Sequence, residues 1–161
     1  MKIYDLFTDE DDLTYFIEFC PNYRLGSFSK VYFIEDTDLV IKETEDEAYL
    51  EFINFINTYH ESKHLPKIYD NIVINGCNYL LMDKLYHTDL NNQEVAEMVG
   101  WWEKDTNVWV GESDTLDKVL YDLEEWYSQS CIHLEWDLRD TNIMQDKLGN
   151  LVITDPWCSN L

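Results

Sequence analysis

Two aspartates and an asparagine near the end of the chain have the types and the spacing that phosphoryl transfer requires. Asp137 precedes Asn142 by five residues, and Asp155 follows Asn142 by thirteen, directly after the strand-like run 151–154. Moving a phosphoryl group from ATP needs a carboxylate that orients the attacking hydroxyl, together with an amide oxygen and a second carboxylate that bind magnesium. We therefore expect Asp137 to be the catalytic carboxylate and Asn142 and Asp155 to be ligands of Mg2+.

Each of these three residues also has an ordinary structural interpretation. Asp137 can cap a turn, Asn142 is of a type common in turns, and an aspartate before proline, as at Asp155, can end a strand. The functional interpretation is favoured because the ordinary one requires three unrelated residues to fall at this spacing together.

Arg139 lies two residues after Asp137, where a basic side chain can neutralise the phosphate during transfer. The same side chain can instead pair at the surface with Asp140 or Glu135. Both interpretations stay open, and Arg139 is included among the candidate catalytic residues.

A second group of residues, in the first half of the chain, is suited to hold the phosphates of ATP. Lys42 ends the apolar run 39–41 and follows Gly26 by sixteen residues, and a lysine at the end of such a strand can grip phosphate oxygens. Gly26 and Ser27 lie in the turn 25–32, whose backbone amides can face the same phosphates. A lysine can also guard a sheet edge against aggregation, and an ordinary β-turn has the same sequence pattern.

A lysine in this role needs an acidic partner on the helix that follows it. Apolar residues recur at helical spacing over 45–60, and Glu47 and Glu51 lie one turn apart in that segment. Both face away from the apolar stripe, whereas Glu45 is nearer to it but close to Lys42 in sequence. We take Glu51 as the partner, which requires the helix to pack obliquely.

The remaining pattern predicts an α+β fold. In the first half we expect a helix over 8–20, strands over 23–34 and 38–43, the helix 45–60, and strands over 67–73 and 77–84 that flank an Asn75-Gly76 turn. A polar connection over 86–92 leads to a short helix over 93–103 and to a loop over 106–113 that contains Trp109. An amphipathic helix over 116–131, the loop with Asp137 and a hairpin turning at 147–150 complete the chain. A strand-rich first half and a helical second half favour two lobes.

The composition is that of a folded but strongly acidic chain. Its 161 residues include 33 acidic and 11 basic ones, for a net charge of −22, and 15% are aromatic, which is too many for a disordered acidic tail. The charge disfavours direct binding of nucleic acid, because so few basic residues cannot neutralise its phosphates. It fits either a well-solvated surface or attraction to basic partner proteins, among them nucleic-acid-binding ones.

The cysteines and the hydropathy pattern predict a soluble intracellular protein. Cys20, Cys77, Cys131 and Cys158 are widely scattered, so we expect neither a zinc site nor a disulfide framework. No apolar run is long enough to cross a membrane, and the acidic N-terminal segment is unlike a targeting peptide.

With these residues in place, the chain resembles the eukaryotic-type protein kinase superfamily, and within it the early protein kinases of T7-like bacteriophages. The matching stretches are 25–32, 40–42, 142–144 and 153–156. Three features depart from the family pattern: Glu135 and Trp136 replace the usual His-Arg before Asp137, the turn keeps one glycine, and six residues follow Asp155. We therefore expect a minimal, C-terminally truncated form of the kinase.

The resemblance implies a two-lobed protein-kinase-like fold with a strand-rich N-lobe and a reduced helical C-lobe. It divides the chain into an N-terminal helical extension (1–22), an N-lobe (23–85) and a C-lobe with the catalytic loop and metal-binding hairpin (86–161). It implies ATP and Mg2+ as ligands, with Lys42 holding the phosphates. It further implies serine/threonine phosphorylation of host proteins in the host cytoplasm during host takeover.

Two other functions fit the same sequence. The first is a catalytically weak or inactive kinase-like protein whose acidic surface binds and inhibits a host protein, such as a nucleic-acid-binding one. The second is a small-molecule phosphotransferase like the aminoglycoside kinases, which use the same Asp-x4-Asn sequence element.

Overall fold

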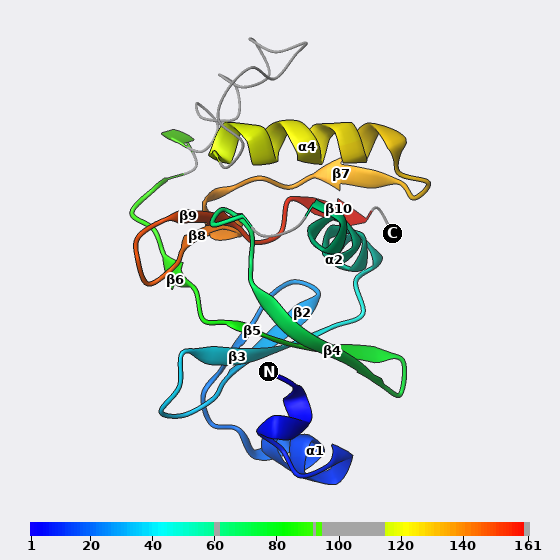
Figure 1. The fold of residues 1–161 in the computed structure, drawn as a ribbon, viewed down its shortest axis with the longest axis vertical. Helices are drawn as coiled ribbons and strands as arrows, with labels where there is room; N and C mark the ends of the chain where they lie inside the picture. The colour runs from blue at the N-terminus through cyan, green and yellow to red at the C-terminus, as the bar shows by residue number, and fades with distance from the viewer. Residues whose placement is uncertain (60–61, 92, 95–114, 160–161) are drawn as a thin grey trace. The chain divides into compact units, whose positions relative to one another are not determined.

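The computed structural model describes residues 1–59, 62–91, 93–94 and 115–159, which divide into two compact units (Figure 1). Unit 1 comprises Met1–Asp46 and Lys67–Lys84, and unit 2 comprises Glu47–Pro66 and Leu85–Leu161. Both mix helices with strands, so the α+β prediction is confirmed. The predicted lobes put residues 47–59 with the first group of strands, whereas the structure groups them with the C-terminal part of the chain. The predicted loop around Trp109 and most of the helix 93–103 lie outside the described residues.

Unit 1 is built on a five-stranded antiparallel sheet in the order β1-β2-β3-β5-β4. Its strands are β1 (Tyr23–Leu25), β2 (Ser29–Phe33), β3 (Leu39–Thr44), β4 (Ile68–Ile74) and β5 (Cys77–Asp83). The β4–β5 hairpin turns at Asn75 and Gly76, whose φ angles are 52° and 86°. Two successive positive φ angles match the right-handed twist of a two-residue hairpin, and this is why Asn-Gly is favoured there.

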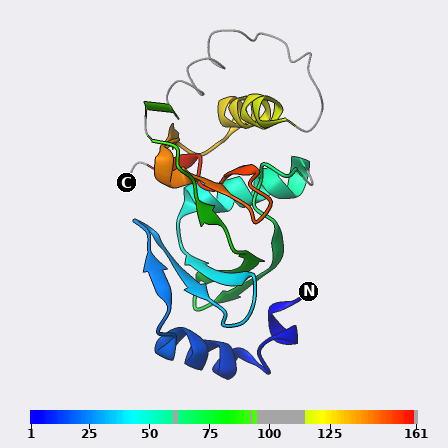
Figure 2. The same cartoon turned by 90° about the vertical axis from the view of Figure 1, so that its left-hand side faces the viewer.

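One face of this sheet is covered by helix α1 (Glu10–Phe19) and the 3-10 turn η1 (Ile3–Asp5), which lie on the same side of it (Figure 2). Leu13 of α1 is fully buried against Tyr32 and Ile41 of the sheet. The helix begins after Asp9, whose carboxylate accepts a hydrogen bond from the Asp12 N–H at 3.0 Å. That capping bond satisfies an N–H group that has no partner within the helix.

The opposite face of the sheet carries Lys42. Successive residues of a strand point to opposite faces, and Ile41 belongs to the core under α1. Lys42 therefore points the other way, together with its register partners Val31 on β2 and Leu80 on β5. The lysine is a buried residue, so its ammonium group lies in an environment where a charge needs a partner.

Unit 2 contains two longer helices and two small antiparallel sheets. The helices are α2 (Glu47–Tyr59) and α4 (Leu116–Gln129), one sheet is β6 (Tyr86–His87), β8 (Ile143–Gln145) and β9 (Leu151–Ile153), and the other is β7 (Leu134–Trp136) and β10 (Trp157–Ser159). In Figure 1 the helix α4 runs alongside β7. No helix among the described residues has the length and apolar character needed to cross a bilayer.

The core of unit 2 is an aromatic cluster around Trp157. Its indole is 1% exposed and makes edge-to-face contacts with Phe52 and Phe55 of α2, at centroid separations of 6.0 and 6.2 Å. Trp136 packs against it from β7 at 6.0 Å. Edge-to-face pairs at these separations are favourable beyond the area that they bury, so this cluster fixes the strand that follows Asp155.

Candidate active site

Asp137 and Asn142 are held together by the turn that follows β7. The strand ends at Trp136, and the 3-10 turn η2 (Asp140–Asn142) brings Asn142 back toward Asp137. The Asn142 N–H donates to the Arg139 carbonyl at 2.9 Å and closes the turn. The Asn142 side-chain amide donates to the Asp137 carbonyl at 2.6 Å and to its carboxylate Oδ2 at 3.0 Å. The spacing of five residues is thus the spacing of one short turn.

Asp155 is brought to the same place by two backbone hydrogen bonds that flank it. The Thr154 N–H donates to the Asn142 carbonyl at 2.9 Å, and the Asp137 N–H donates to the Pro156 carbonyl at 2.8 Å. The β8–β9 pairing precedes these bonds, and the β7–β10 pairing follows them. The structure therefore brings together the three residues that the sequence singled out in this unit.

Arg139 pairs with Asp137, a partner that neither sequence-based interpretation named, and its role toward a phosphate stays a prediction. Its guanidinium Nη2 lies 2.6 Å from the Asp137 Oδ2. The hydrogen bond to Asp137, and then the negative charges of Asp137 and Asp155, raise the pKa of Arg139 above its ordinary value, against a lowering effect of partial burial. The guanidinium therefore lies directly beside the Asp137 carboxylate.

Tyr49 is a neighbour of Asp155 that the sequence analysis did not select. It lies on α2, is 1% exposed, and has a pKa raised well above its ordinary value, first by burial and then by the negative charge of Asp155. In the sequence it appears only as one member of the apolar stripe of the helix. The signal that distinguishes it is its hydroxyl, which is costly to bury away from polar groups.

The donor set of Asn142 and Asp155 suits magnesium. The Asn142 amide nitrogen is committed to Asp137, so the amide oxygen, on the other side of the same planar group, is directed away from Asp137. One amide oxygen and one carboxylate are hard oxygen donors, and Mg2+ combines one or two such ligands with water and phosphate oxygens. Among the described residues no group of three His, Cys, Asp or Glu side chains is placed to hold a metal. Asn142 and Asp155 contribute a single carboxylate between them.

Gly26 and Ser27 lie in the turn between β1 and β2, within unit 1. The Gly26 N–H donates to the Ser29 carbonyl at 2.8 Å, so this amide is used by the turn itself. A Cβ at Gly26 would lie 2.8 Å from the Ser29 Oγ, so a larger residue there would require the Ser29 side chain to move. A cavity of about 320 Å³ adjoins the turn, lined among others by Lys30 and Glu43. Lys30 and Glu43 are on the sheet face opposite Lys42. The cavity is lined by the predicted phosphate-binding residues Gly26 and Ser27 but not by Lys42.

Glu51 lies on α2 and is bound to α4. Its Oε1 accepts hydrogen bonds from the Trp126 Nε1 at 2.9 Å and from the Ser130 Oγ at 3.4 Å, and its Oε2 accepts one from Asn54 at 3.3 Å. The predicted pair between Glu51 and Lys42 joins residues of the two units, and it stays a prediction.

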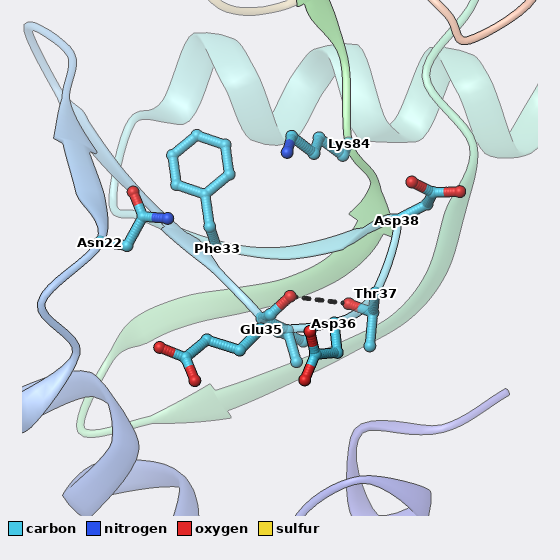
Figure 3. A pocket seen from close by; sticks show the side chains of 8 residues that line it. Asn22, Phe33, Glu35, Asp36, Thr37, Asp38 and Lys84 are labelled. Carbon is cyan, nitrogen blue, oxygen red and sulfur yellow. Dashed lines mark hydrogen bonds between the residues drawn. The ribbon is translucent and has the colours of Figure 1, made fainter.

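A larger cavity, of about 450 Å³, lies in unit 1 beside the β2–β3 turn (Figure 3). Phe33 and Lys84 form one wall, with the ammonium 5.4 Å from the ring centroid. The turn 34–38 forms a second wall of the cavity. The Thr37 hydroxyl stabilises this turn by donating a hydrogen bond to the Ile34 carbonyl at 2.9 Å. None of the predicted site residues lines this cavity.

No protein-family model matches the sequence of this chain, and no curated protein is significantly similar to it. The candidate activity therefore rests on the residues described above.

Proposed function

We propose that the protein is a phage-encoded serine/threonine kinase of minimal, protein-kinase-like architecture that transfers the γ-phosphate of ATP to host proteins inside the infected cell. The observation that carries the proposal is the hydrogen-bonded group of Asp137, Asn142 and the segment around Asp155. These residues have the chemistry that phosphoryl transfer requires, and two pairs of short strands hold them in place.

Each residue of this group has a distinct role in the proposed reaction. Asp137 orients the attacking hydroxyl and accepts its proton as the hydroxyl oxygen bonds to the γ-phosphorus. The bond from that phosphorus to the bridging oxygen breaks, and ADP leaves. Arg139 stabilises the charge that develops on the transferring group. Asn142 and Asp155 would hold magnesium, which supplies neutralisation of the phosphate charge when it is bound.

Lys42 would hold the α- and β-phosphates of ATP. Its place on β3, on the sheet face that α1 does not cover, supports this role. The Asp-x4-Asn element also occurs in small-molecule kinases, and the acceptor is assigned as protein from the resemblance of the Ile-Thr-Asp-Pro segment to the phage enzymes.

The test is incorporation of label from [γ-32P]ATP in the presence of Mg2+, with a bacterial lysate whose own kinases have been inactivated as acceptor. Asp137→Asn keeps the shape of the side chain and removes its charge, so we expect incorporation to fall by at least about 100-fold. Asp89→Asn makes the same change at an exposed position outside the site and should leave incorporation unchanged. Incorporation that survives in Asp137→Asn, or that is absent from the unaltered protein, would refute the kinase activity.

A further inference from the structure

Helix α1 presents an aromatic pair to solvent. Tyr15 is 65% and Phe19 is 59% exposed, and their rings lie 4.6 Å apart, one helical turn from each other. Large exposed aromatic groups that lie together are uncommon on protein surfaces and mark sites of interaction. Because the two rings already pack on each other, they form a preorganised surface that loses little side-chain entropy on binding.

The pair lies among carboxylates on the outward face of the helix. Leu13, Phe16 and Ile17 point into the core of unit 1. With 100° between successive residues, Asp11, Tyr15 and Glu18 line the opposite side, and Phe19 lies next to Tyr15. The outward face of α1, defined by these last four residues, therefore alternates acidic and aromatic groups.

No basic side chain neutralises this face from within the helix. The segment from residue 1 to residue 20 contains one basic residue, Lys2, and its ammonium lies 3.0 Å from the Asp70 carboxylate. Asp9 and Asp12 accept hydrogen bonds from backbone N–H groups at the start of α1. Within the described part of the chain, Asp11 and Glu18 have no ion pair. They are exposed, so their carboxylates face solvent beside the aromatic rings.

We propose that the outward face of α1 docks an arginine-rich segment of a partner protein. A guanidinium group can stack flat on an aromatic ring while its edge donates two hydrogen bonds to a carboxylate, and this face offers both groups side by side. An ammonium group can also lie over an aromatic ring, but it is not planar, so it cannot stack flat on the ring and donate a bidentate pair of hydrogen bonds at its edge. The net charge of −22 accelerates the approach of a basic partner and repels nucleic acid. The docking surface is independent of the proposed kinase activity.

The test measures binding of two fluorescein-labelled peptides of equal length, one of arginine and one of lysine, to the full-length protein by fluorescence anisotropy. We expect tighter binding of the arginine peptide. The Tyr15→Ala/Phe19→Ala variant should bind that peptide about fivefold or more weakly and the lysine peptide almost as well as before. The Ile132→Ala/Leu148→Ala variant, which removes exposed apolar groups of unit 2, should bind both peptides normally.

The charge contribution is tested in the same way. Asp11→Asn/Glu18→Gln should weaken binding of both peptides more than Glu47→Gln/Glu125→Gln, which removes two exposed carboxylates elsewhere. Equal losses in these two variants would reduce the interaction to general electrostatics and overturn the proposal. So would equal affinity for the two peptides with no effect of the aromatic substitutions. A dimer in sedimentation experiments that Tyr15→Ala/Phe19→Ala dissociates would assign the face to a second copy of the chain and overturn it too.

Discussion

The side-chain amide of Asn142 is hydrogen-bonded to Asp137 twice, once at the backbone carbonyl and once at the carboxylate. These bonds orient the whole amide group: the nitrogen faces the proposed catalytic aspartate and the oxygen faces away from it. A single side chain can therefore position one aspartate and bind a metal ion beside it. This double role gives the site its most specific prediction.

Replacing Asn142 by alanine or by aspartate should separate the two roles. Asn142→Ala removes both hydrogen bonds and the metal-binding oxygen, so we expect a loss of about 1 kcal/mol in the free energy of unfolding and no stabilisation by Mg2+. Asn142→Asp also removes the donors and adds a negative charge beside Asp137, but it keeps oxygens for a metal. Its melting temperature should be lower than that of the unaltered protein and should rise on addition of Mg2+.

Differential scanning calorimetry with and without Mg2+ measures these shifts. Asn57→Ala, at an exposed position on α2, is the matched control and should respond to Mg2+ as the unaltered protein does. Stabilisation of Asn142→Ala by Mg2+ as large as that of the unaltered protein would show that the amide oxygen is not a ligand.

Substitution of Trp157 should test the aromatic core of unit 2. Trp157→Ala removes a side chain that is 1% exposed and packed against Phe52, Phe55 and Trp136. We expect a loss of about 3–5 kcal/mol in the free energy of unfolding, measured by urea denaturation. Leu148→Ala, at a side chain that is 81% exposed, should change it by less than about 0.5 kcal/mol. A loss below 1 kcal/mol for Trp157→Ala would contradict this packing.

Glu51 should stabilise unit 2 because its side chain accepts hydrogen bonds, and not because it is charged. Glu51→Ala leaves the Trp126 Nε1 without its acceptor, so we expect a loss of about 1–3 kcal/mol. Glu51→Gln keeps an oxygen for this bond and should lose clearly less in the same denaturation experiment. Equal losses in the two variants would mean that the charge matters. A drop in ATP affinity in Glu51→Gln, measured by calorimetry, would support the predicted pair with Lys42.

Asp70 should make the stability of unit 1 depend on pH in the acid range. Burial alone would raise its pKa, but hydrogen bonds from the Ile3 N–H, the Lys2 side chain and the Asn71 backbone, with the Lys2 charge, lower the pKa below its ordinary value. A carboxyl whose pKa is lower in the folded state stabilises the fold above its unfolded pKa of roughly 3.9. That stability is lost as the pH falls through the folded value.

To isolate this effect, the free energy of unfolding of the unaltered protein is compared with that of Asp70→Asn, by urea denaturation from neutral pH down to pH 3. The unaltered protein should be more stable at neutral pH, and the difference should shrink below about pH 4. Other carboxyls titrate in both proteins and cancel in the difference. A difference that is constant with pH would contradict the proposed role of the Asp70 charge.

The fold was most predictable where one local rule decides the outcome. The Asn75-Gly76 turn lies where it was expected, because two positive φ angles allow few other residues. The helix was predicted to begin at Thr8, whereas the N-cap of α1 is Asp9 and its first residue is Glu10. Both residue types can cap a helix, so the local sequence alone does not choose between them.

The residues that carry the chemistry of the candidate site could be selected from the sequence. The residues that position them were harder to select. Asp137, Asn142 and Asp155 were found because their spacing is a local property. The strands that hold them, β7 and β10, are three residues long, which is too short for a period of two to be recognised. The effect of Asp155 on the pKa of Tyr49 acts between residues far apart in sequence, and no pattern within either segment encodes it.

Trp157 follows Asp155 by two residues and is enclosed by aromatic side chains on both α2 and β7. A displacement of Asp155 away from Asn142 would remove this indole from its cluster and break the β7–β10 pairing. The segment is therefore expected to have one stable conformation rather than two. A phosphotransferase built on this framework would be active as soon as it has folded, without a separate activating conformational change. Its output in the cell would then be governed by how much of the protein is made and which acceptors it meets.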